Sequence, residues 1–499
     1  MFEKDPTTRL WAVSSVAAFL LAALSYFFLF GQRSKKKYKY PLPPRSGYGF
    51  LETFQHFNST KLHEWTLEVA RTRGRIVEMN LWPLLPRDTL YAVTDPVVAR
   101  KILENPRSLK PRELYEFFDR MMGGVCFISE EGERYKHPRK STLMGISHAN
   151  MDDMLANIHA VMDKWIQDNL GSEEGDVACV DIGFEMQKAT IHSIGLIAFG
   201  YDFSTAEQEF TSNALAKITY EFGIASEKNP LRKHPIIGLL WADKREAIRC
   251  VEDVRCLVRK VLQAHRNKSF EEQKKVVTLN SLDAPGKYDE IGGEESLLSD
   301  MILLYAAGFD TTGYTISYAL VELCKNKDIQ TQLRKELLDA TQDPKDKKLI
   351  GSPLLKRVVK ETLRLWPVAA GGGIRRVPDK MIVTSDDGKG GKRLMTLPKG
   401  SWAHVAPYPL LRDDEVFDRP DEWLPSRWEN ATDDMKTAFM PFMVGRRSCP
   451  GQLLAITESE VFLARLVRDY EWTLIEESIP EWSVTLKIKG TILQATKIG

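Results

Sequence analysis

One short string of the chain combines residue types that could bind an iron cofactor: Phe442–Gly451, with the sequence FMVGRRSCPG. Its cysteine, Cys449, lies directly before an expected helix, where free N–H groups and the positive end of the helix stabilise a thiolate. Arg447 presents a planar set of donors that suits a carboxylate, and the glycines let backbone approach a flat cofactor closely. The string therefore predicts a cysteine thiolate on haem iron, with Arg447 on a haem propionate. A buried structural cysteine at a helix start is the alternative.

A second string, Ala306–Thr312 (AAGFDTT), places polar residues in the middle of an otherwise apolar helix. Gly308 weakens the helix locally, and a threonine hydroxyl can divert a backbone carbonyl and open the hydrogen-bond ladder. Buried polar groups such as those of Asp310 and Thr311 require hydrogen-bond partners or serve a function. The pattern predicts a small polar space that can hold dioxygen and water. A helix kink filled by satisfied hydroxyl groups is the alternative.

A third feature is the pair Glu361 and Arg364, whose spacing places both side chains on one helix face. The spacing alone carries little information, because it recurs elsewhere in the chain. The position carries more, since the pair directly precedes Leu365-Trp366-Pro367 and lies well ahead of Cys449.

The order and separation of these motifs resemble those of the cytochrome P450 superfamily, and the resemblance covers nearly the whole chain. It implies that Cys449 is the axial ligand of the iron. It also implies that Asp310 and Thr311 are catalytic residues that relay protons to dioxygen.

The family completes its Glu-x-x-Arg pair with an arginine from a proline-flanked motif, and Pro425–Trp428 (PSRW) matches that motif. Arg427 is retained, whereas Ser426 and Trp428 replace the commoner Glu and Phe. We expect Glu361 to be held between Arg364 and Arg427 in a structural role.

The resemblance also implies a set of residues around haem b. Besides Cys449 these are Arg447, Arg375, Arg139, Tyr135, Phe442 and Gly451. Arg376 is adjacent to Arg375, so the resemblance leaves open which of these two arginines contacts the propionate. Tyr135 stands where the family has a tryptophan, four residues before Arg139, and its hydroxyl can still donate a hydrogen bond.

The elements that would position these residues are mostly helices. Long apolar or amphipathic patterns predict helices throughout residues 112–270 and at 296–325, 352–366 and 452–470. Short strands are expected within 75–95 and 374–405, a helix capped by Asp95 and Pro96 follows the first pair, and residues 266–295 look like a surface connection. The expected fold is therefore mainly α: one large helical domain of the cytochrome P450 type with small β-sheets.

The N-terminus predicts a membrane anchor. The 21 residues 10–30 carry no charge, and a helix with a rise of about 1.5 Å per residue spans a bilayer core of roughly 30 Å at that length. Basic residues follow at once, which favours a cytosolic position for the rest of the chain. We expect a short luminal segment (1–9), the anchor (10–30), a basic and proline-rich linker (31–49) and a catalytic domain (50–499), in the endoplasmic reticulum membrane. A cleaved signal peptide is the alternative, but bulky residues occupy its cleavage position.

Composition excludes other classes. Lys and Arg (69) balance Asp and Glu (68) to a formal net charge of +1, so no nucleic-acid partner that binds through bulk charge is expected. The six cysteines include no Cys-x-x-Cys pair, and the nine histidines form no zinc motif.

The resemblance implies a monooxygenase that inserts one oxygen atom of dioxygen into a lipophilic small molecule of lipid metabolism, such as a fatty acid, sterol or terpenoid. No flavin or nicotinamide motif occurs in the chain, so electrons should come from a separate partner. The resemblance implies an NADPH-dependent flavoprotein reductase in that role, with cytochrome b5 as a further donor. Arg134, Lys136, Arg139 and Lys140 could form its docking surface, and a solvated helix face is the alternative. A haem-thiolate isomerase or dehydratase and a non-catalytic haem sensor are the other functions considered, and the Asp310-Thr311 pair argues against the first.

Overall fold

The structure is a computed structural model that describes residues 38–498 apart from 58, 82–88, 172, 226–228, 235 and 387–390. The expected luminal segment and anchor, 1–30, lie outside the described residues, as does the linker as far as residue 37. Within the described part of the chain, no helix combines the length and the apolar character needed to cross a membrane.

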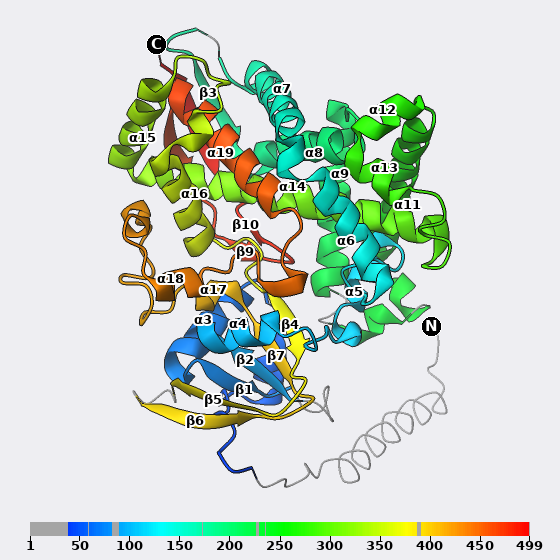
Figure 1. The fold of residues 1–499 in the computed structure, drawn as a ribbon, viewed down its shortest axis with the longest axis vertical. Coiled ribbons are helices and arrows are strands. Elements are labelled where there is room, and N and C mark those ends of the chain that lie inside the picture. The colour runs from blue at the N-terminus through cyan, green and yellow to red at the C-terminus, as the bar shows by residue number, and fades with distance from the viewer. Residues whose placement is uncertain are drawn as a thin grey trace, which may run out of the picture.

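Helices dominate the fold (Figure 1), which confirms the mainly α prediction. The α-helices are α2 (Phe50–Phe57), α3 (Leu62–Arg73), α4 (Pro96–Glu104), α5 (Glu116–Met122), α6 (Glu133–Gly145), α7 (Met151–Asn169), α8 (Ile182–Phe199), α9 (Thr205–Tyr220), α11 (Ala242–Arg266), α12 (Phe270–Lys275), α13 (Val277–Leu282), α14 (Gly293–Lys325), α15 (Lys327–Ala340), α16 (Pro353–Leu365), α17 (Pro407–Leu410), α18 (Asp433–Ala438) and α19 (Gln452–Asp469).

The strands form small sheets. They are β1 (Ile76–Met79), β2 (Leu90–Val93), β3 (Val177–Asp181), β4 (Gly373–Arg376), β5 (Met381–Asp386), β6 (Lys392–Leu397), β7 (Trp402–Val405), β8 (Tyr470–Glu476), β9 (Glu481–Trp482), β10 (Leu486–Lys487) and β11 (Ile492–Lys497). One four-stranded sheet has the order β1-β2-β7-β4, with β2 parallel to β7. A three-stranded sheet, β3-β11-β8, lies at the opposite end of the molecule in Figure 1.

Several expected elements are confirmed with small shifts of boundary. Strands β1 and β2 pair antiparallel, and the Asp95 side chain accepts from the N–H groups of Val97 and Val98 at the start of α4.

The chain before β1 is joined to the sheets by backbone hydrogen bonds, from Glu78 N to Pro44 O (2.7 Å) and from Thr396 N to Pro41 O (2.8 Å).

The expected surface connection at 266–295 is wrong in part, because it contains the helices α12 and α13. Leu279 and Leu282 of α13 are fully buried, since that helix packs against α6 and α8. The segment contains only four apolar residues between its charged and glycine-rich flanks, too few for a helical period to be visible: Val276, Val277, Leu279 and Leu282.

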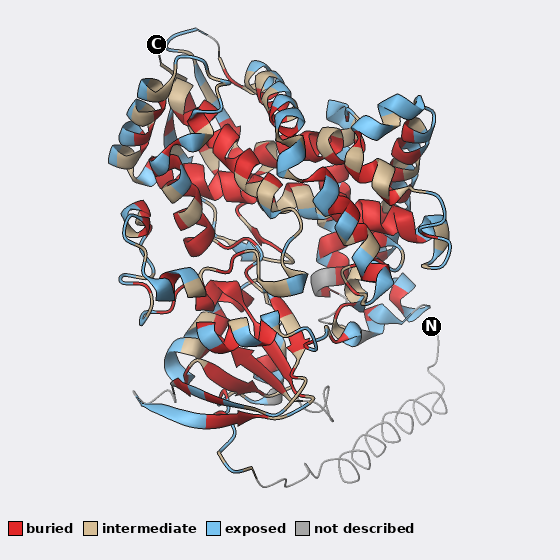
Figure 2. Ribbon diagram, viewed as in Figure 1, coloured by how far each residue is buried: buried red, intermediate tan, exposed pale blue. Residues whose placement is uncertain are grey.

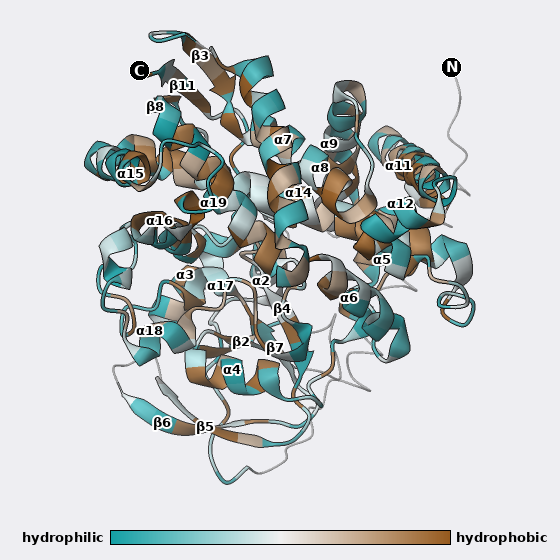
Figure 3. Cartoon of the chain, turned by 45° about the horizontal axis from the view of Figure 1, so that its top comes forward, coloured by the Kyte–Doolittle hydropathy of each residue, from teal (hydrophilic) through white to brown (hydrophobic). Residues whose placement is uncertain are grey.

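The 33-residue helix α14 runs through the middle of the molecule and packs against α8 and α19. Figure 2 shows the buried residues concentrated along it and its neighbours. Peripheral helices such as α11 and α15 carry both hydrophobic and hydrophilic residues (Figure 3), as expected of helices with one face towards the core.

A buried carboxylate fixes the irregular chain ahead of α19. Glu361 on α16 pairs with Arg364 (2.8 and 2.9 Å) and with Arg427 (2.9 Å), and the Leu424 N–H also donates to it at 2.9 Å. The Arg364 guanidinium in turn donates to the carbonyls of Leu411, Pro420 and Glu422. The predicted position of Glu361 between two arginines is confirmed.

Candidate functional site

Cys449 lies in the turn between the short helix Gly445–Arg447 and the start of α19. Its backbone N–H donates to the Phe442 carbonyl at 2.9 Å, which closes the loop. Gly445 has a φ of +77°, and a Cβ there would lie 2.6 Å from the Leu103 carbonyl of α4, so the loop approaches that helix as only glycine permits.

The Cys449 side chain is exposed to small molecules although protein surrounds it. Desolvation by the surrounding protein raises the pKa of its thiol, while a hydrogen bond from the Gly451 N–H and the charge of Arg139 act in the opposite direction. Binding to a metal cation would deprotonate the thiol outright.

The middle of α14 is less buried than the rest of the helix. Ala307 is exposed and Ala306, Gly308, Asp310 and Thr311 are only half-buried, whereas most of the helix on either side is buried. Because α14 runs through the centre of the fold (Figure 2), the exposure of these residues interrupts an otherwise buried core helix. The chain thus presents an accessible thiol from one element and a polar notch from another.

The two expected catalytic residues have different surroundings. The Thr311 hydroxyl donates to the Ala307 carbonyl at 2.7 Å, which is the predicted diversion of the helix ladder. The Asp310 carboxylate accepts from Gln187 of α8 at 2.5 Å and from Thr485 beside β10, and lies 3.6 Å from the Lys487 ammonium. The Asp310 carboxylate thus has partners from two other segments of the chain, whereas the Thr311 hydroxyl bonds only within α14.

Arg447 is largely buried and stacks on the Tyr135 ring, its guanidinium carbon 3.4 Å from the ring centre. It forms an ion pair with Glu131 at 3.2 Å and donates to the Glu130 carbonyl. Its Nε finds no hydrogen-bond partner among the described residues. Desolvation lowers the pKa of Arg447. A buried arginine with an unsatisfied N–H donor is stabilised when an anion or another hydrogen-bond acceptor binds beside it.

Tyr135 and Arg139, both on α6, hold the loop of Cys449. The Tyr135 hydroxyl donates to the Arg446 carbonyl, and Arg139 donates to the carbonyl and the hydroxyl of Ser448, the latter at 3.1 Å. The tyrosine that replaces the family's tryptophan thus keeps a donor function, directed at the loop backbone.

The structure separates Arg375 from Arg376. Arg375 is 2% exposed and donates to the Ile374 carbonyl at 2.9 Å. Arg376 lies on the other face of β4, where it pairs with Glu113 and stacks over Trp402. Strand alternation therefore turns only Arg375 inward.

A further cation that the sequence did not indicate, Lys110, lies beside these arginines. Desolvation lowers the pKa of Lys110 most, and the nearby charges of Arg447 and Arg375 lower it further, while the charge of Glu131 raises it. A single lysine next to a proline forms no motif, so only the fold brings it here. The inward cations outnumber the carboxylates beside them, which is the donor set expected for a ligand with anionic groups, and the site fits a haem with its propionates.

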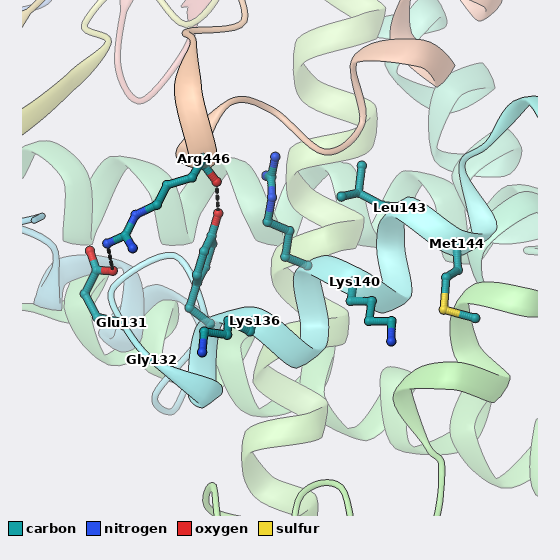
Figure 4. A pocket seen from close by; sticks show the side chains of 9 residues that line it. Glu131, Gly132, Lys136, Lys140, Leu143, Met144 and Arg446 are labelled. Carbon is teal, nitrogen blue, oxygen red and sulfur yellow. Dashed lines mark hydrogen bonds and ion pairs between the residues drawn. The ribbon is translucent and has the colours of Figure 1, made fainter. Parts of the chain in front are cut away.

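The proposed docking surface needs correction. Arg134 is not on the surface: it is 8% exposed and pairs with buried Asp300 at 2.6 Å. Lys136 and Lys140 are exposed and border a groove of about 630 Å³ that Arg446 also lines. Figure 4 shows Arg446 directed at Glu131 at one end of this groove, with Leu143 and Met144 at the other.

Three successive glycines, 371–373, accommodate close packing. A Cβ on Gly371 would lie 2.6 Å from the Trp482 ring, and one on Gly372 (φ +60°) would overlap the Val405 carbonyl at 1.9 Å. The glycines therefore allow a tight bend beneath the final hairpin.

Comparison with known proteins places these features in a family. The cytochrome P450 family model matches residues 41–497. The human mitochondrial 25-hydroxyvitamin D-1 alpha hydroxylase is 36% identical over 184 residues, which cover 36% of this chain and 34% of that protein. The mitochondrial sterol 26-hydroxylase of Oryctolagus cuniculus is 36% identical over 184 residues, covering 35% of this chain and 33% of that protein.

A Drosophila melanogaster protein, the probable cytochrome P450 4ac1, is 22% identical over 480 residues that cover 90% of this chain and 89% of that protein. The alignments to the two hydroxylases thus span about a third of those proteins, whereas the family model extends from the first strands to the last. With a cysteine loop, a polar notch and an inward cationic cluster in place, the chain belongs to the cytochrome P450 family.

Proposed function

We propose that this chain is a haem-thiolate monooxygenase that inserts one oxygen atom of dioxygen into a lipophilic small molecule. The observation that carries the proposal is the pairing of an accessible, desolvated Cys449 with the half-buried Asp310 and Thr311 of α14. The haem, when bound through its iron to a cysteine thiolate, supplies the activation of dioxygen.

The chain's own residues position that cofactor and serve its chemistry. Cys449 provides the thiolate, while Arg447 and Arg375 neutralise the propionates. Arg139 and Tyr135 hold the cysteine loop against α6, and Phe442 and Gly451 shape the loop on either side of the thiolate. These contacts restrict the ligand to one geometry, which preorganises the site.

Asp310 and Thr311 would control proton delivery. The Asp310 carboxylate bridges from the α14 notch to Lys487 at 3.6 Å, so it can take a proton on that side and release it on the notch side. The Thr311 hydroxyl, held by the Ala307 carbonyl at 2.7 Å, can accept a hydrogen bond from water or a bound reactant. A haem-thiolate isomerase that handles a peroxide would not need this pair.

The substrate class and the electron donor are part of the proposal. The relatives include hydroxylases of a sterol and of a vitamin D derivative, which supports a lipophilic substrate. We propose a separate NADPH-dependent flavoprotein reductase as donor, docked at the groove beside Lys136, Lys140 and Arg446, and the endoplasmic reticulum as location. The mitochondrial hydroxylases make a different type of donor the competing possibility, which reconstitution with each donor decides.

The decisive test is the difference spectrum of the dithionite-reduced protein with and without carbon monoxide, on the wild type and Cys449→Ser. We expect a strongly red-shifted Soret band that disappears in the variant. Cys324→Ser, at a buried position on α14, is the matched control and should keep the band. A band at the position of a histidine-ligated haem in the wild type, or no haem, would overturn the proposal.

A further inference from the structure

Met443 adopts a backbone conformation that is unusual for its residue type. It lies in the cysteine loop (442–451), directly after Phe442, at a position that the pattern FxxGxRxCxG leaves open. Its φ is +57°, and among the described residues Arg419 is the one other non-glycine residue with a positive φ. A residue with a Cβ is disfavoured in this region. Such strain persists only where the surrounding structure enforces it, and it concentrates at functional sites.

Hydrogen bonds fix both polar groups of the peptide unit that joins Phe442 to Met443. The carbonyl of this unit, on Phe442, accepts the Cys449 N–H at 2.9 Å. The N–H of the unit, on Met443, donates to the Met440 carbonyl at 3.0 Å. Because a peptide unit is planar, the φ of Met443 is the first rotation after it. This rotation therefore sets the direction in which the Met443 side chain leaves a backbone that is bonded to Cys449.

The Met443 side chain extends from the cysteine loop to strand β4. Its terminal methyl group lies 3.4 Å from the position that a Cβ on Gly373 would take. Nη1 of Arg375 and the Tyr115 hydroxyl each lie 3.2 Å from the same position. Met443 is half-buried and packs against the hydrophobic cluster that contains Val405, the partner of Gly373 on β7. Gly373 thus leaves room for the methyl group, and the contact joins the cysteine loop to the strand that carries Arg375.

We propose that Met443 is a positioning residue for the Cys449 thiolate, because its side chain braces the cysteine loop against Gly373 of β4. The inference rests on the proposed function, since it takes Cys449 as the iron ligand. The positive φ of Met443 directs the side chain at β4 from a peptide unit that already holds the backbone of Cys449. Methionine is unbranched at Cβ and flexible, which suits both a strained backbone and a narrow gap. The competing explanation is a contact that stabilises only the fold as a whole.

The test follows thiolate ligation and the fold separately in one urea titration of the haem-loaded protein. The red-shifted Soret band of the reduced carbon monoxide complex reports the thiolate, and far-UV circular dichroism reports the helices. At urea concentrations where the circular dichroism is still native, Met443→Ala should raise the ratio of the ordinary to the red-shifted band about tenfold over the wild type, because a half-buried contact is lost. Met443→Leu keeps an apolar side chain of similar size and should retain the wild-type ratio.

Arg419→Ala is the matched control, since it truncates the other non-glycine residue with a positive φ, outside the cysteine loop, and should leave the band ratio unchanged. If Met443→Ala keeps the wild-type ratio, or loses the red-shifted band only together with the circular dichroism, the proposal is wrong. An equal loss of the band in Met443→Leu would also overturn it. If Met443→Ala fails to fold, Met443→Gly replaces it, because glycine removes the side chain and relieves the strained backbone; a wild-type ratio in that variant overturns the proposal. A wild type without the red-shifted band would refute the proposed function instead.

Discussion

The indole N–H of Trp428 donates to Oε2 of Glu361 at 2.8 Å. Arg364 donates to the same oxygen at 2.9 Å, so the tryptophan adds a donor to a carboxylate that two arginines already hold. The family more often has a phenylalanine there, which has no donor. The substitution therefore strengthens the attachment of the irregular chain before α19 to α16.

Trp428→Phe should lower the free energy of unfolding by about 1.5–3 kcal/mol, since the lost hydrogen bond is to a charged group and the site is buried. Trp423→Phe is the matched control, because the Trp423 indole donates to the neutral Thr362 hydroxyl at 3.1 Å and its loss should cost about 1 kcal/mol. Urea unfolding of both variants measures the difference. Equal losses would contradict a special role for the donor to Glu361.

The Glu361 network was predictable because its residues lie in compact motifs whose chemistry is local. The turn that carries Cys449 was predictable in the same way, because residues close in the chain form it; the role of Cys449 as the iron ligand stays a prediction. Lys110 and Asp300 were missed for the opposite reason: their partners come from distant segments, and the sequence gives no spacing for such contacts. Arg134 was placed wrongly on the surface because its pairing with Asp300 crosses from α6 to α14.

For Arg375 and Arg376 the sequence left two candidates, and the structure was needed to choose between them. Adjacent residues of a strand point to opposite faces, so one had to face inward and one outward. The sequence cannot say which until the register of β4 against β7 is known, where Arg375 pairs with Ala403. The fold supplied that register, and with it the assignment.

Thr311→Val should uncouple dioxygen consumption from product formation, because the variant keeps the shape of the side chain but has no hydroxyl to orient water in the α14 notch. We expect several-fold more of the consumed dioxygen to appear as hydrogen peroxide, measured with a peroxide assay beside product analysis. Thr315→Val removes an equivalent bond one turn away, from the buried Thr315 hydroxyl to the Thr311 carbonyl at 2.9 Å. Only Thr311→Val should change the peroxide yield. An equal increase in both variants would show that the effect comes from the loss of a threonine-to-carbonyl hydrogen bond within α14 and not from the position of the Thr311 hydroxyl.

Gly371→Ala should displace Trp482, since the new Cβ would lie 2.6 Å from its ring. Overpacking of this kind costs about 1–3 kcal/mol of unfolding free energy, and Trp482 belongs to the final hairpin that packs near Asp310 through Thr485. The difference in tryptophan fluorescence between the variant and the wild type reports the displacement, because both proteins share the other ten tryptophans. Denaturant unfolding measures the loss of stability. Gly351→Ala, with no atom within 4 Å of the added Cβ, should have no such effect. Unchanged fluorescence in Gly371→Ala would mean that the backbone moves instead of the ring.

Glu458 on α19 should make the stability of the protein depend on pH. It is 2% exposed, its Oε1 has no hydrogen-bond partner within the described structure, and burial raises its pKa from 4.5 to about 8. The folded state therefore keeps a proton that the unfolded chain releases across this range. Stability falls as pH rises between these values, by about 1.4 kcal/mol per pH unit from this group.

Glu458→Gln removes this titration. The free energy of unfolding of the variant, relative to that of the wild type, should therefore change little near pH 5 and should rise by about 1.4 kcal/mol with each pH unit towards pH 8. Urea unfolding of both proteins at a series of pH values measures the difference, in which the titration of all other groups cancels. Glu271→Gln, whose side chain is 78% exposed, is the control and should follow the wild type at every pH. A constant difference between Glu458→Gln and the wild type would show that Glu458 is ionised in the folded protein throughout, with a partner that stabilises its charge.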